Sequence, residues 1–368
     1  MAWYIGLMSG TSLDGVDGVL ARPDNGVLLR TAAHVHRPFD ADLRAKLLDL
    51  NTSGSDEVHR SALAANALMR LYAQVVMQLA HAAGLPADQI RAVGAHGQTV
   101  RHRPGEFDGT GYTVQLVNGA LLAELTGVDV ICDFRTRDLA AGGQGAPLVP
   151  AFHAACFARP GQAVAVLNVG GIANLTLLPA QGPVRGFDCG PGNVLLDLWC
   201  QRHQARPFDA DGAWAARGRV RQGLLDRWLQ EPYFALSPPK STGRDLFDAA
   251  WLDARLDDTS AEDVMASLTE LTAVSAIRAL RAHAPGTRQL LVCGGGAHNR
   301  HLMARLVELG GPDLRVQPTT AAGIPPDQVE ALAFAWLAER FVCGEPGSLP
   351  AVTGARGARR LGALYPAH

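Results

Sequence analysis

The sequence of 368 residues lacks several features that would set it apart from the ordinary globular proteins. No apolar run reaches the roughly 18 residues needed to span a membrane. No basic stretch followed by a long apolar segment opens the chain, so we expect no signal peptide. The 33 Lys and Arg residues are offset by 35 Asp and Glu residues, and the lack of a basic excess argues against a general nucleic-acid binder. We therefore expect a cytoplasmic protein with no membrane partner and no nucleic-acid partner.

Cysteine is also scarce. The six Cys residues form no CxxC pair, and none is spaced from a His as in a zinc finger. We expect them to be buried small apolar residues in a reducing compartment. With 48% hydrophobic and 18% charged residues, the chain is too apolar for a disordered protein, and its length predicts two or three domains.

Glycine, in contrast, is plentiful at 40 residues, and much of it lies in short clusters. Because glycine lets backbone N–H groups approach a ligand closely, each cluster is a candidate binding loop. The clusters are GTSLDG (10–15), AAGGQG (140–145), NVGGIAN (168–174), DCGPGN (188–193) and CGGGAHN (293–299).

The first cluster joins two predicted strands, residues 3–8 and 16–20, and so lies in a hairpin. Its two glycines have the spacing of a Walker A motif, but Val16 and Asp17 stand where Lys and Ser or Thr are required, which excludes a P-loop NTPase. The turn still offers hydroxyl and backbone donors for a phosphate, and Asp14 and Asp17 could orient a hydrated Mg²⁺. An ordinary tight hairpin with solvated acids is the alternative.

A similar unit recurs in the second half of the chain. Residues 163–169 predict a buried strand, which a Gly pair joins to a second strand within 174–179. The Gly-rich and Pro-containing stretch 140–150 is a candidate hinge between the halves. The chain thus predicts two halves that each open with a strand, a polar Gly turn and another strand. Apolar spacing predicts long helices at 55–83, 260–284 and 327–342.

Two acids have surroundings suited to catalysis. Asp188 lies between an aromatic residue and a Gly-Pro-Gly turn, which would hold a general base rigidly. The alternative is that it only accepts hydrogen bonds from the turn. Glu330 lies near the start of the apolar helix at 327–342, where it is either a charge that complements the helix dipole or a site residue.

Polar loops follow two other predicted strands. HGQT (96–99) follows a strand at 90–95, and DFRTRD (133–138) follows a strand at 128–132. Their His and Arg side chains could hold an anionic ligand or a sugar, or form ordinary polar loops. SPPKSTG (237–243) contains fragments of the penicillin-interactive enzymes, but it has no S-D-N partner and its Pro pair breaks the required helix, which excludes that class.

Together these segments resemble one family, the anhydro-N-acetylmuramic acid kinases of bacterial cell-wall recycling. Seven segments between residues 4 and 345 carry the resemblance in this order: SGTSLDGVD, HGQT, DFR.RD.A.GGQGAPL.P, N.GGIAN.T, FD.GPGN, PPKSTGR and P.D..EA.AFAWLA. The resemblance implies an α/β fold of the two-lobed, actin-like (ribonuclease H-like) ATPase class, with the nucleotide in the cleft between the lobes. We expect an N-terminal lobe at 1–135, on which 346–368 packs back, and a C-terminal lobe at 136–345.

The resemblance also implies catalytic and sugar-binding roles. Asp188 is the expected catalytic base, Glu330 helps to hold the water or the sugar, and Arg135 contacts the substrate and stabilises charge. His96 and Gln98 are expected to bind the sugar.

The same resemblance implies a nucleotide site. Many members of the superfamily begin the first phosphate turn with Asp, whereas Ser9 stands there in this chain, so we expect Asp14 to organise Mg²⁺. The residues expected around ATP are Gly10, Thr11, Ser12, Leu13, Asp14, Gly15, Val16, Asp17, Asn168, Gly170, Gly171, Gly294, Gly295 and Gly296.

The implied activity is that of an ATP-dependent kinase with an unusual substrate. It would open the 1,6-anhydro ring of 1,6-anhydro-N-acetylmuramic acid with water and phosphorylate O6, giving N-acetylmuramate 6-phosphate and ADP in peptidoglycan recycling and amino-sugar catabolism. ATP and Mg²⁺ are the expected cofactors, a small sugar the expected partner and a homodimer the expected assembly. Three alternatives stay open: a non-catalytic ATPase of the same superfamily, a kinase for another sugar, and a hydrolase of anhydro sugars that uses Asp188 and Glu330 without ATP.

Overall fold

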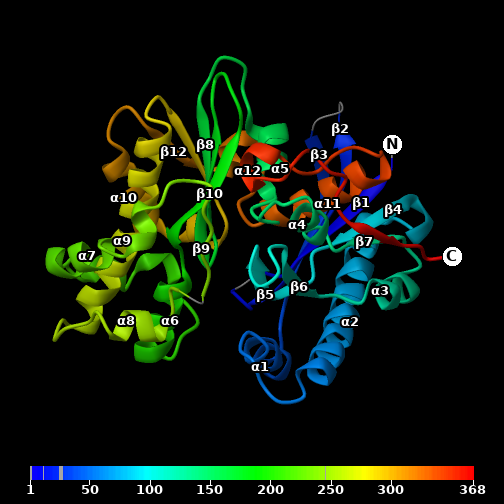
Figure 1. Ribbon diagram of the computed structural model, residues 1–368, viewed down its shortest axis with the longest axis horizontal. Helices are drawn as coiled ribbons and strands as arrows, with labels where there is room; N and C mark the ends of the chain where they lie inside the picture. Colours follow the sequence, from blue (N-terminus) through cyan, green and yellow to red (C-terminus); the bar gives the residue numbers. More distant parts are fainter. Residues whose placement is uncertain (1, 11, 25–27, 245) are drawn as a thin grey trace. The chain divides into compact units, whose positions relative to one another are not determined.

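A computed structural model describes residues 2–10, 12–24, 28–244 and 246–368. The chain forms two compact units, one made of Met1–Cys156 with Asp327–His368 and the other of Phe157–Pro326 (Figure 1). Each unit is built on its own β-sheet.

The first unit contains a six-stranded sheet in the order β13-β7-β4-β1-β2-β3. Three strands, β1, β4 and β7, run parallel, while β2 is antiparallel to both β1 and β3, and β13 is antiparallel to β7. The strands are β1 (Trp3–Met8), β2 (Gly15–Asp24), β3 (Leu28–Pro38), β4 (Ile90–Ala95), β7 (Val130–Cys132) and β13 (Ala363–Tyr365).

Helices and a small hairpin complete this unit. The longest helix packs its apolar residues, among them Leu68, Tyr72 and Leu79, into the core beside the sheet. That helix begins at Glu57 and ends before Gly84, which has a φ of +64° and closes the last turn as a left-handed cap. The elements are α1 (Ala41–Asp49), α2 (Glu57–Ala83), β5 (Gln98–Pro104), β6 (Gly111–Leu116), α3 (Gly119–Thr126), α4 (Thr136–Ala140), α5 (Val149–Phe157), α11 (Val329–Val342) and α12 (Pro350–Thr353).

Helix α11 lies directly on the backbone of β1 and β4. An added Cβ at Gly6 would overlap with the carbonyl oxygen of Ala331, and one at Gly94 would overlap with that of Phe334. Glycine at these two strand positions therefore allows the helix to approach the sheet closely. The apolar helix predicted at 327–342 thus belongs to the first unit, although it follows the second unit in the sequence.

The second unit contains a five-stranded sheet in the order β10-β9-β8-β11-β12. Its core lies between this sheet and the long helix α9, whose N-cap Ser260 accepts a hydrogen bond from Asp263 N at 3.3 Å. The strands are β8 (Val164–Val169), β9 (Ile172–Leu178), β10 (Arg185–Pro191), β11 (Gln289–Cys293) and β12 (Arg315–Pro318). The helices are α6 (Val194–Gln204), α7 (Gln222–Leu229), α8 (Ala249–Asp253), α9 (Ala261–His283) and α10 (Arg300–Gly310).

The two sheets share one topology. In each, the first strand is antiparallel to the second, the second is antiparallel to the third, and the fourth and fifth follow in parallel on the other side of the first. The strand orders β3-β2-β1-β4-β7 and β10-β9-β8-β11-β12 therefore correspond strand by strand. The predicted duplication and the predicted α/β fold of two actin-like, ribonuclease H-like units are confirmed.

The boundaries of the units differ from those expected at 135/136 and 345/346. The first unit extends to Cys156 and takes the chain back at Asp327. The reason is local packing: the stretch at 140–150 is bonded to the C-terminal segment, and α11 packs on β1 and β4. The candidate hinge at 140–150 accordingly lies within the first unit.

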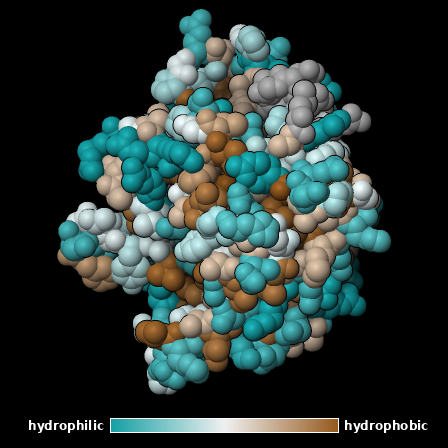
Figure 2. Space-filling model, turned by 90° about the vertical axis from the view of Figure 1, so that its right-hand side faces the viewer, coloured by the Kyte–Doolittle hydropathy of each residue, from teal (hydrophilic) through white to brown (hydrophobic). Residues whose placement is uncertain are grey.

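Surface and helix composition agree with the balanced sequence. The face in Figure 2 mixes hydrophilic and hydrophobic residues, with the hydrophobic ones in small groups. In the parts of the chain that the structure describes, no helix combines the length and the apolar character needed to cross a membrane.

Candidate active site

The predicted site residues of the first unit follow strands that run in one direction. Ser9 and Gly10 come after β1, His96 comes after β4, and Arg135 comes three residues after β7. These three strands are parallel neighbours, so their carboxyl ends meet at one edge of the sheet. Ligands of α/β proteins usually bind at that edge.

The turn after β1 is held by side chains from neighbouring elements. Ser9 Oγ lies 2.9 Å from the hydroxyl of Tyr72 and donates to the carbonyl of Gly97 at 3.0 Å. Gln98 Nε2 donates to Gly10 O at 3.1 Å. The Gln98 side chain is buried, and its Oε1 has no hydrogen-bond partner among the described residues. A buried acceptor of this kind suits a ligand hydroxyl or amide.

The rest of this loop offers mainly its backbone. Leu13 and Val16 are buried in the core, and an added Cβ at Gly15 would overlap with the backbone of Arg37. Their side chains therefore cannot line a nucleotide site, although their N–H groups can. The predicted residue Thr11 lies outside the described residues.

The two acids of this loop have different surroundings. Asp14 is exposed and accepts a hydrogen bond from Ser12 Oγ at 2.8 Å. Asp17 lies on β2, where its Oδ1 is 3.3 Å from His34 Nε2 and 3.0 Å from His36 Nδ1.

This pairing changes the acidity of the groups involved. The hydrogen bond to the Asp17 carboxylate raises the pKa of His36 against the effect of burial. The negative charges of Asp17, Asp14 and Asp327 raise it further. Bonds from His34 and His36 outweigh burial and lower the pKa of Asp17. The Asp17 carboxylate is thus paired with both histidines. Among the described residues no group of three His, Cys, Asp or Glu side chains could hold a metal ion by itself.

His96 and Arg135 form a defined pair. His96 Nδ1 lies 2.7 Å from Gly97 O, and Arg135 reaches His96 Nε2 with Nε at 3.1 Å and Nη2 at 2.9 Å. Because a guanidinium only donates, His96 Nε2 must accept and Nδ1 must carry the proton. Burial, and next the charge of Arg135, lower the pKa of His96 to about 3, so this imidazole is neutral. Arg135 Nη1 also donates to Gly145 O at 2.8 Å.

Glu330 enters the same unit on α11. It lies in the first turn of that helix and is half-buried. Four residues later Phe334 stacks on His96 with ring centroids 4.7 Å apart. Residues four apart share a helix face, so Glu330 lies one turn from the contact with His96. The predicted residues Gln98, His96, Arg135 and Glu330 are therefore gathered at one edge of the first unit.

In the second unit, the predicted residues again follow parallel strands. Asn168 is the penultimate residue of β8, followed by Gly170 and Gly171, and Gly294 follows β11. An added Cβ at Gly294 would overlap with Asn168 Oδ1, and one at Gly296 would overlap with Val169 Cγ1. Only glycine lets this loop lie against the end of β8, while Gly295 remains exposed.

A third segment supports the Gly turn of this unit. Gly170 O accepts from Asn193 N at 2.8 Å, and Gly171 O accepts from Gly192 N at 2.9 Å. Asn168 is buried, and its Oδ1 has no hydrogen-bond partner among the described residues. An unpaired buried acceptor between two glycine loops fits a polar ligand group.

Asp188 lies near the end of β10, which runs in the same direction as β8. Its Oδ2 accepts from Thr242 N at 3.0 Å, its N–H donates to Lys240 O at 3.3 Å, and its carbonyl accepts from the Tyr233 hydroxyl at 2.8 Å. The carboxylate is therefore fixed by backbone from the segment 238–244, whose role the sequence left open. The sequence predicted a Gly-Pro-Gly turn after Asp188, whereas β10 continues through Gly190 and Pro191, with a bulge between Asp188 and Gly190.

Lys240 is the functional candidate that sequence reasoning missed. Its ammonium lies 4.7 Å from the centre of the Tyr233 ring and donates to Tyr233 O at 3.2 Å. Burial lowers the pKa of Lys240, and the nearby Cys189 and Asp188 oppose this shift. The signal was present in PPKSTGR, but no spacing rule connects that segment with β10.

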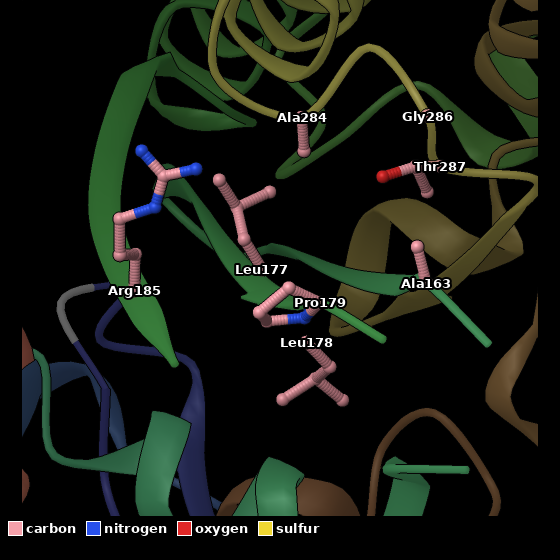
Figure 3. A pocket seen from close by; sticks show the side chains of 8 residues that line it. All are labelled: Ala163, Leu177, Leu178, Pro179, Arg185, Ala284, Gly286 and Thr287. Atoms are coloured by element: carbon pink, nitrogen blue, oxygen red, sulfur yellow. The ribbon is translucent and has the colours of Figure 1, made fainter. Parts of the chain in front are cut away.

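A small hollow lies at the other end of this sheet (Figure 3). Its volume is about 190 Å³. It is formed where β8 and β11 begin, away from the glycine turns at their carboxyl ends. It therefore includes none of the predicted site residues. Its lining residues are Ala163, Leu177, Leu178, Pro179, Arg185, Ala284, Gly286 and Thr287.

Comparisons with known proteins agree with the predicted family. The model of a family described as anhydro-N-acetylmuramic acid kinase matches residues 2–367. A protein of that name from Variovorax paradoxus (strain S110) is 59% identical over 373 residues, covering 99% of this chain and 99% of its own. Another from Bordetella petrii is 58% identical over 371 residues, covering 99% of this chain and 96% of its own.

Solved structures are more distant. The ADPNP-bound activator of the 2-hydroxyisocaproyl-CoA dehydratase from Clostridium difficile matches with a TM-score of 0.46 at 12% identity, over 90% of this chain and 92% of that one. The ROK hexokinase from Thermus thermophilus matches with a TM-score of 0.38 at 15% identity, over 92% and 99%. The evidence for the family is the match over nearly the whole sequence: the chain belongs to the anhydro-N-acetylmuramic acid kinase family.

Proposed function

We propose that this enzyme opens the 1,6-anhydro ring of 1,6-anhydro-N-acetylmuramic acid with water and transfers the γ-phosphoryl group of ATP to O6. The products would be N-acetylmuramate 6-phosphate and ADP, as in peptidoglycan recycling. The observation that carries the proposal is the family match over residues 2–367, together with full-length relatives of that name at 58–59% identity.

The proposed role of Asp188 is that of the general base. A carboxylate fixed by Thr242 N–H keeps one orientation, as a base that takes a proton from an attacking water should. The water oxygen would bond to the anomeric carbon, the bond from that carbon to O6 would break, and O6 would attack the γ-phosphorus. The proton lost by the water goes to Asp188, and ADP leaves.

The residues of the first unit suit recognition of a polar, anionic sugar. Arg135 carries a permanent charge, and its contacts with His96 and Gly145 hold its guanidinium in one orientation. His96 stays neutral because burial depresses its pKa, so its Nε2 can accept from the Arg135 guanidinium, which keeps its positive charge for an anionic substrate. Gln98 Oε1 supports a hydrogen bond from a sugar hydroxyl.

The glycine loops fit a nucleotide. Gly170, Gly171 and Gly294–Gly296 leave backbone close to any bound group, and Asn168 Oδ1 offers an unused acceptor. Mg²⁺ would neutralise charge on the phosphoryl oxygens. The exposed carboxylate of Asp14, which accepts from Ser12 Oγ, suits a hydrated ion that keeps most of its waters.

The test is ADP release from ATP and Mg²⁺ with the anhydro sugar, with plain N-acetylmuramic acid as the control. We expect release with the anhydro sugar only. Release with the plain sugar alone would identify a different sugar kinase, and sugar turnover without ATP would identify a hydrolase. ATP turnover that needs no sugar, or filament formation on ATP addition, would favour an actin-like or chaperone-type ATPase.

A variant pair tests the base. Asp188→Asn should lose at least about 100-fold in rate and keep ATP binding, because the amide oxygen can still accept from Thr242 N–H. Asp253→Asn is the matched control, since this exposed acid of the same unit is paired with Arg202 at 2.5 Å. Near-normal turnover of Asp188→Asn would remove Asp188 from the role.

We also propose a homodimer that acts in the cytoplasm on a free sugar. Sedimentation of the purified enzyme, and fractionation of cells that produce it, would test these two points.

A further inference from the structure

We propose that Asp138 is a positioning residue for the reaction, acting on Arg135 through the backbone of Gly145. The inference rests on the proposed substrate role of Arg135. Asp138 lies on α4, and its side chain is completely buried. A buried carboxyl group is costly unless both of its oxygens are bonded, so its contacts deserve explanation.

Both oxygens of Asp138 have partners from distant segments. Oδ2 accepts from Gly145 N at 2.8 Å, and Oδ1 accepts from the Thr353 hydroxyl at 2.9 Å. Thr353 lies in α12, in the C-terminal segment that returns to the first unit. The carboxyl group therefore ties the glycine loop at 140–147 to that segment.

Gly145 passes this contact on to the predicted site. Its N–H donates to Asp138, and its carbonyl oxygen accepts from Arg135 Nη1 at 2.8 Å. The same guanidinium donates to His96 Nε2 through Nε and Nη2. The Arg135 guanidinium is thus held between the neutral imidazole of His96 and the carbonyl oxygen of Gly145, the residue whose N–H is bonded to Asp138.

The glycines of the loop permit this geometry. An added Cβ at Gly143 would overlap with Asp138 Oδ2. Gly145 has a φ of +67°, and an added Cβ there would overlap with Leu139 Cδ1. A side chain at either position would push the loop away from the carboxyl group. Glycine at 143 and 145 therefore lets the loop lie against Asp138.

The C-terminal segment is also hydrogen-bonded to the backbone of the same loop. Gln144 N donates to Thr353 O at 2.8 Å, and Arg356 N donates to Ala141 O at 2.9 Å. These two backbone bonds, together with the bond from Gly145 N to Asp138, restrict the position of Gly145 O. Loss of the carboxyl group should therefore loosen Arg135 while the two backbone bonds keep the segment docked.

The first experiment compares three variants in the ADP-release assay. Asp138→Ala should lower kcat/KM for the sugar about 10-fold or more, because it leaves Gly145 N–H buried and unpaired. Asp138→Asn should recover most of that loss, since its amide oxygen can accept from Gly145 and its NH₂ can donate to Thr353. The matched control is Asp129→Ala: Asp129 also binds the C-terminal segment, accepting from Ala367 N at 3.1 Å, and its other oxygen accepts from Arg91, which lies outside the loop.

A double-mutant cycle separates positioning from a purely structural role. In an Arg135→Lys background, Asp138→Ala should cause little further loss of kcat/KM, because the group through which it acts is already altered. The effect of Asp138→Ala on the free energy of unfolding should be the same in the wild-type and Arg135→Lys backgrounds. An equal loss of kcat/KM in both backgrounds would overturn the proposal. If Asp138→Ala does not fold, Thr353→Val replaces it in the cycle with a smaller expected loss.

Hydrogen exchange of the peptide spanning 139–148 gives a readout independent of activity. Exchange at Gly145 should be faster in Asp138→Ala than in wild type and near wild type in Asp138→Asn. Unchanged exchange in Asp138→Ala would refute the contact itself. If wild type releases no ADP with the sugar, the proposed function fails and the positioning role of Asp138 in the reaction fails with it, whereas the exchange result still decides whether Asp138 holds Gly145.

Discussion

The buried imidazole of His96 should make the protein less stable in weak acid. His96 is 4% exposed and is bonded as a neutral ring between Gly97 and Arg135. Burial first, and then the guanidinium, lower its pKa to about 3 in the folded protein. In the unfolded chain, the ring regains its ordinary pKa of about 6.5.

The sign and size of the effect follow from these two values. Above about pH 6.5, neither state binds a proton at His96, and the full stability is present. Below it, the unfolded chain takes up a proton that the folded protein does not, so stability falls as pH falls towards 3. Between pH 7 and about pH 5 the loss from this one residue should be about 2 kcal/mol.

Other groups contribute to the same curve and must be separated. Burial lowers the pKa of His153 to about 3 as well, which adds a loss of the same sign. His36, whose pKa is raised by Asp17, acts in the opposite direction, because its folded form gains a proton more readily. Both contributions are shared by wild type and a His96 variant, so the difference between the two proteins isolates His96.

The assay is urea unfolding of wild type and His96→Gln at pH 7 and at about pH 5. The glutamine amide does not titrate, and its oxygen can accept from Arg135, so the variant should lose about 2 kcal/mol less than wild type over this interval. The same substitution at the exposed His59 controls for the removal of a histidine as such. Equal pH dependence of wild type and His96→Gln would show that His96 is not a buried neutral ring.

Three further substitutions test packing and electrostatics. Gly94→Ala should destabilise the first unit by about 1–3 kcal/mol in urea unfolding, because its Cβ would overlap with the backbone of Phe334; an unchanged midpoint would contradict the close approach of α11. Gly223→Ala in α7 is the opposite case, with nothing within 4 Å of the added Cβ, and should stabilise by about 0.4–1 kcal/mol. Asp17→Asn should lower the pKa of His36, measured by NMR titration of its ring, and an unchanged titration would contradict the pairing of Asp17 with His36.

Sequence patterns predicted local structure well where apolar residues alone decide it. The strands at 3–8 and 90–95 were expected at the positions of β1 and β4. The repeated unit of strand, glycine turn and strand also appears in both sheets. Such segments are buried by neighbours that any fold of this class supplies, so their pattern is sufficient.

Long-range packing was not visible in the same way. The apolar pattern of α11 shows that it is buried but not against which sheet; only Gly6 and Gly94, small residues on strands, hint at a helix lying close to them. Likewise, nothing in the spacing of PPKSTGR brings Lys240 and Thr242 to Asp188. These contacts depend on chain topology, which one sequence does not display.

The repeated topology gives a physical reason for the positions of the two glycine loops. The fourth strand of the first sheet, β4, is followed by His96 and Gly97, and the fourth strand of the second, β11, is followed by Gly294. Gly97 has a φ of +77° and Gly294 a φ of +76°, and in each an added Cβ would meet backbone, at 2.6 Å from Leu116 O and 2.8 Å from Val169 O. A glycine with a positive φ therefore follows the fourth strand in both units.

The residues around Gly97 and Gly294 differ in chemistry. In the first unit, Gly97 is preceded by a neutral histidine bonded to Arg135 and followed by Gln98, a set suited to a polar sugar. In the second unit, two more glycines follow, and the Cβ-free backbone lies against Asn168 and Val169. A side chain can discriminate among hydroxyls and acids, whereas bare backbone best accommodates a flat or phosphorylated group. Exchanging Gln98 for Gly should therefore weaken sugar binding more than ATP binding, which loses only the support of the Gln98 bond to Gly10 O. An equal loss of both would argue against this division of roles.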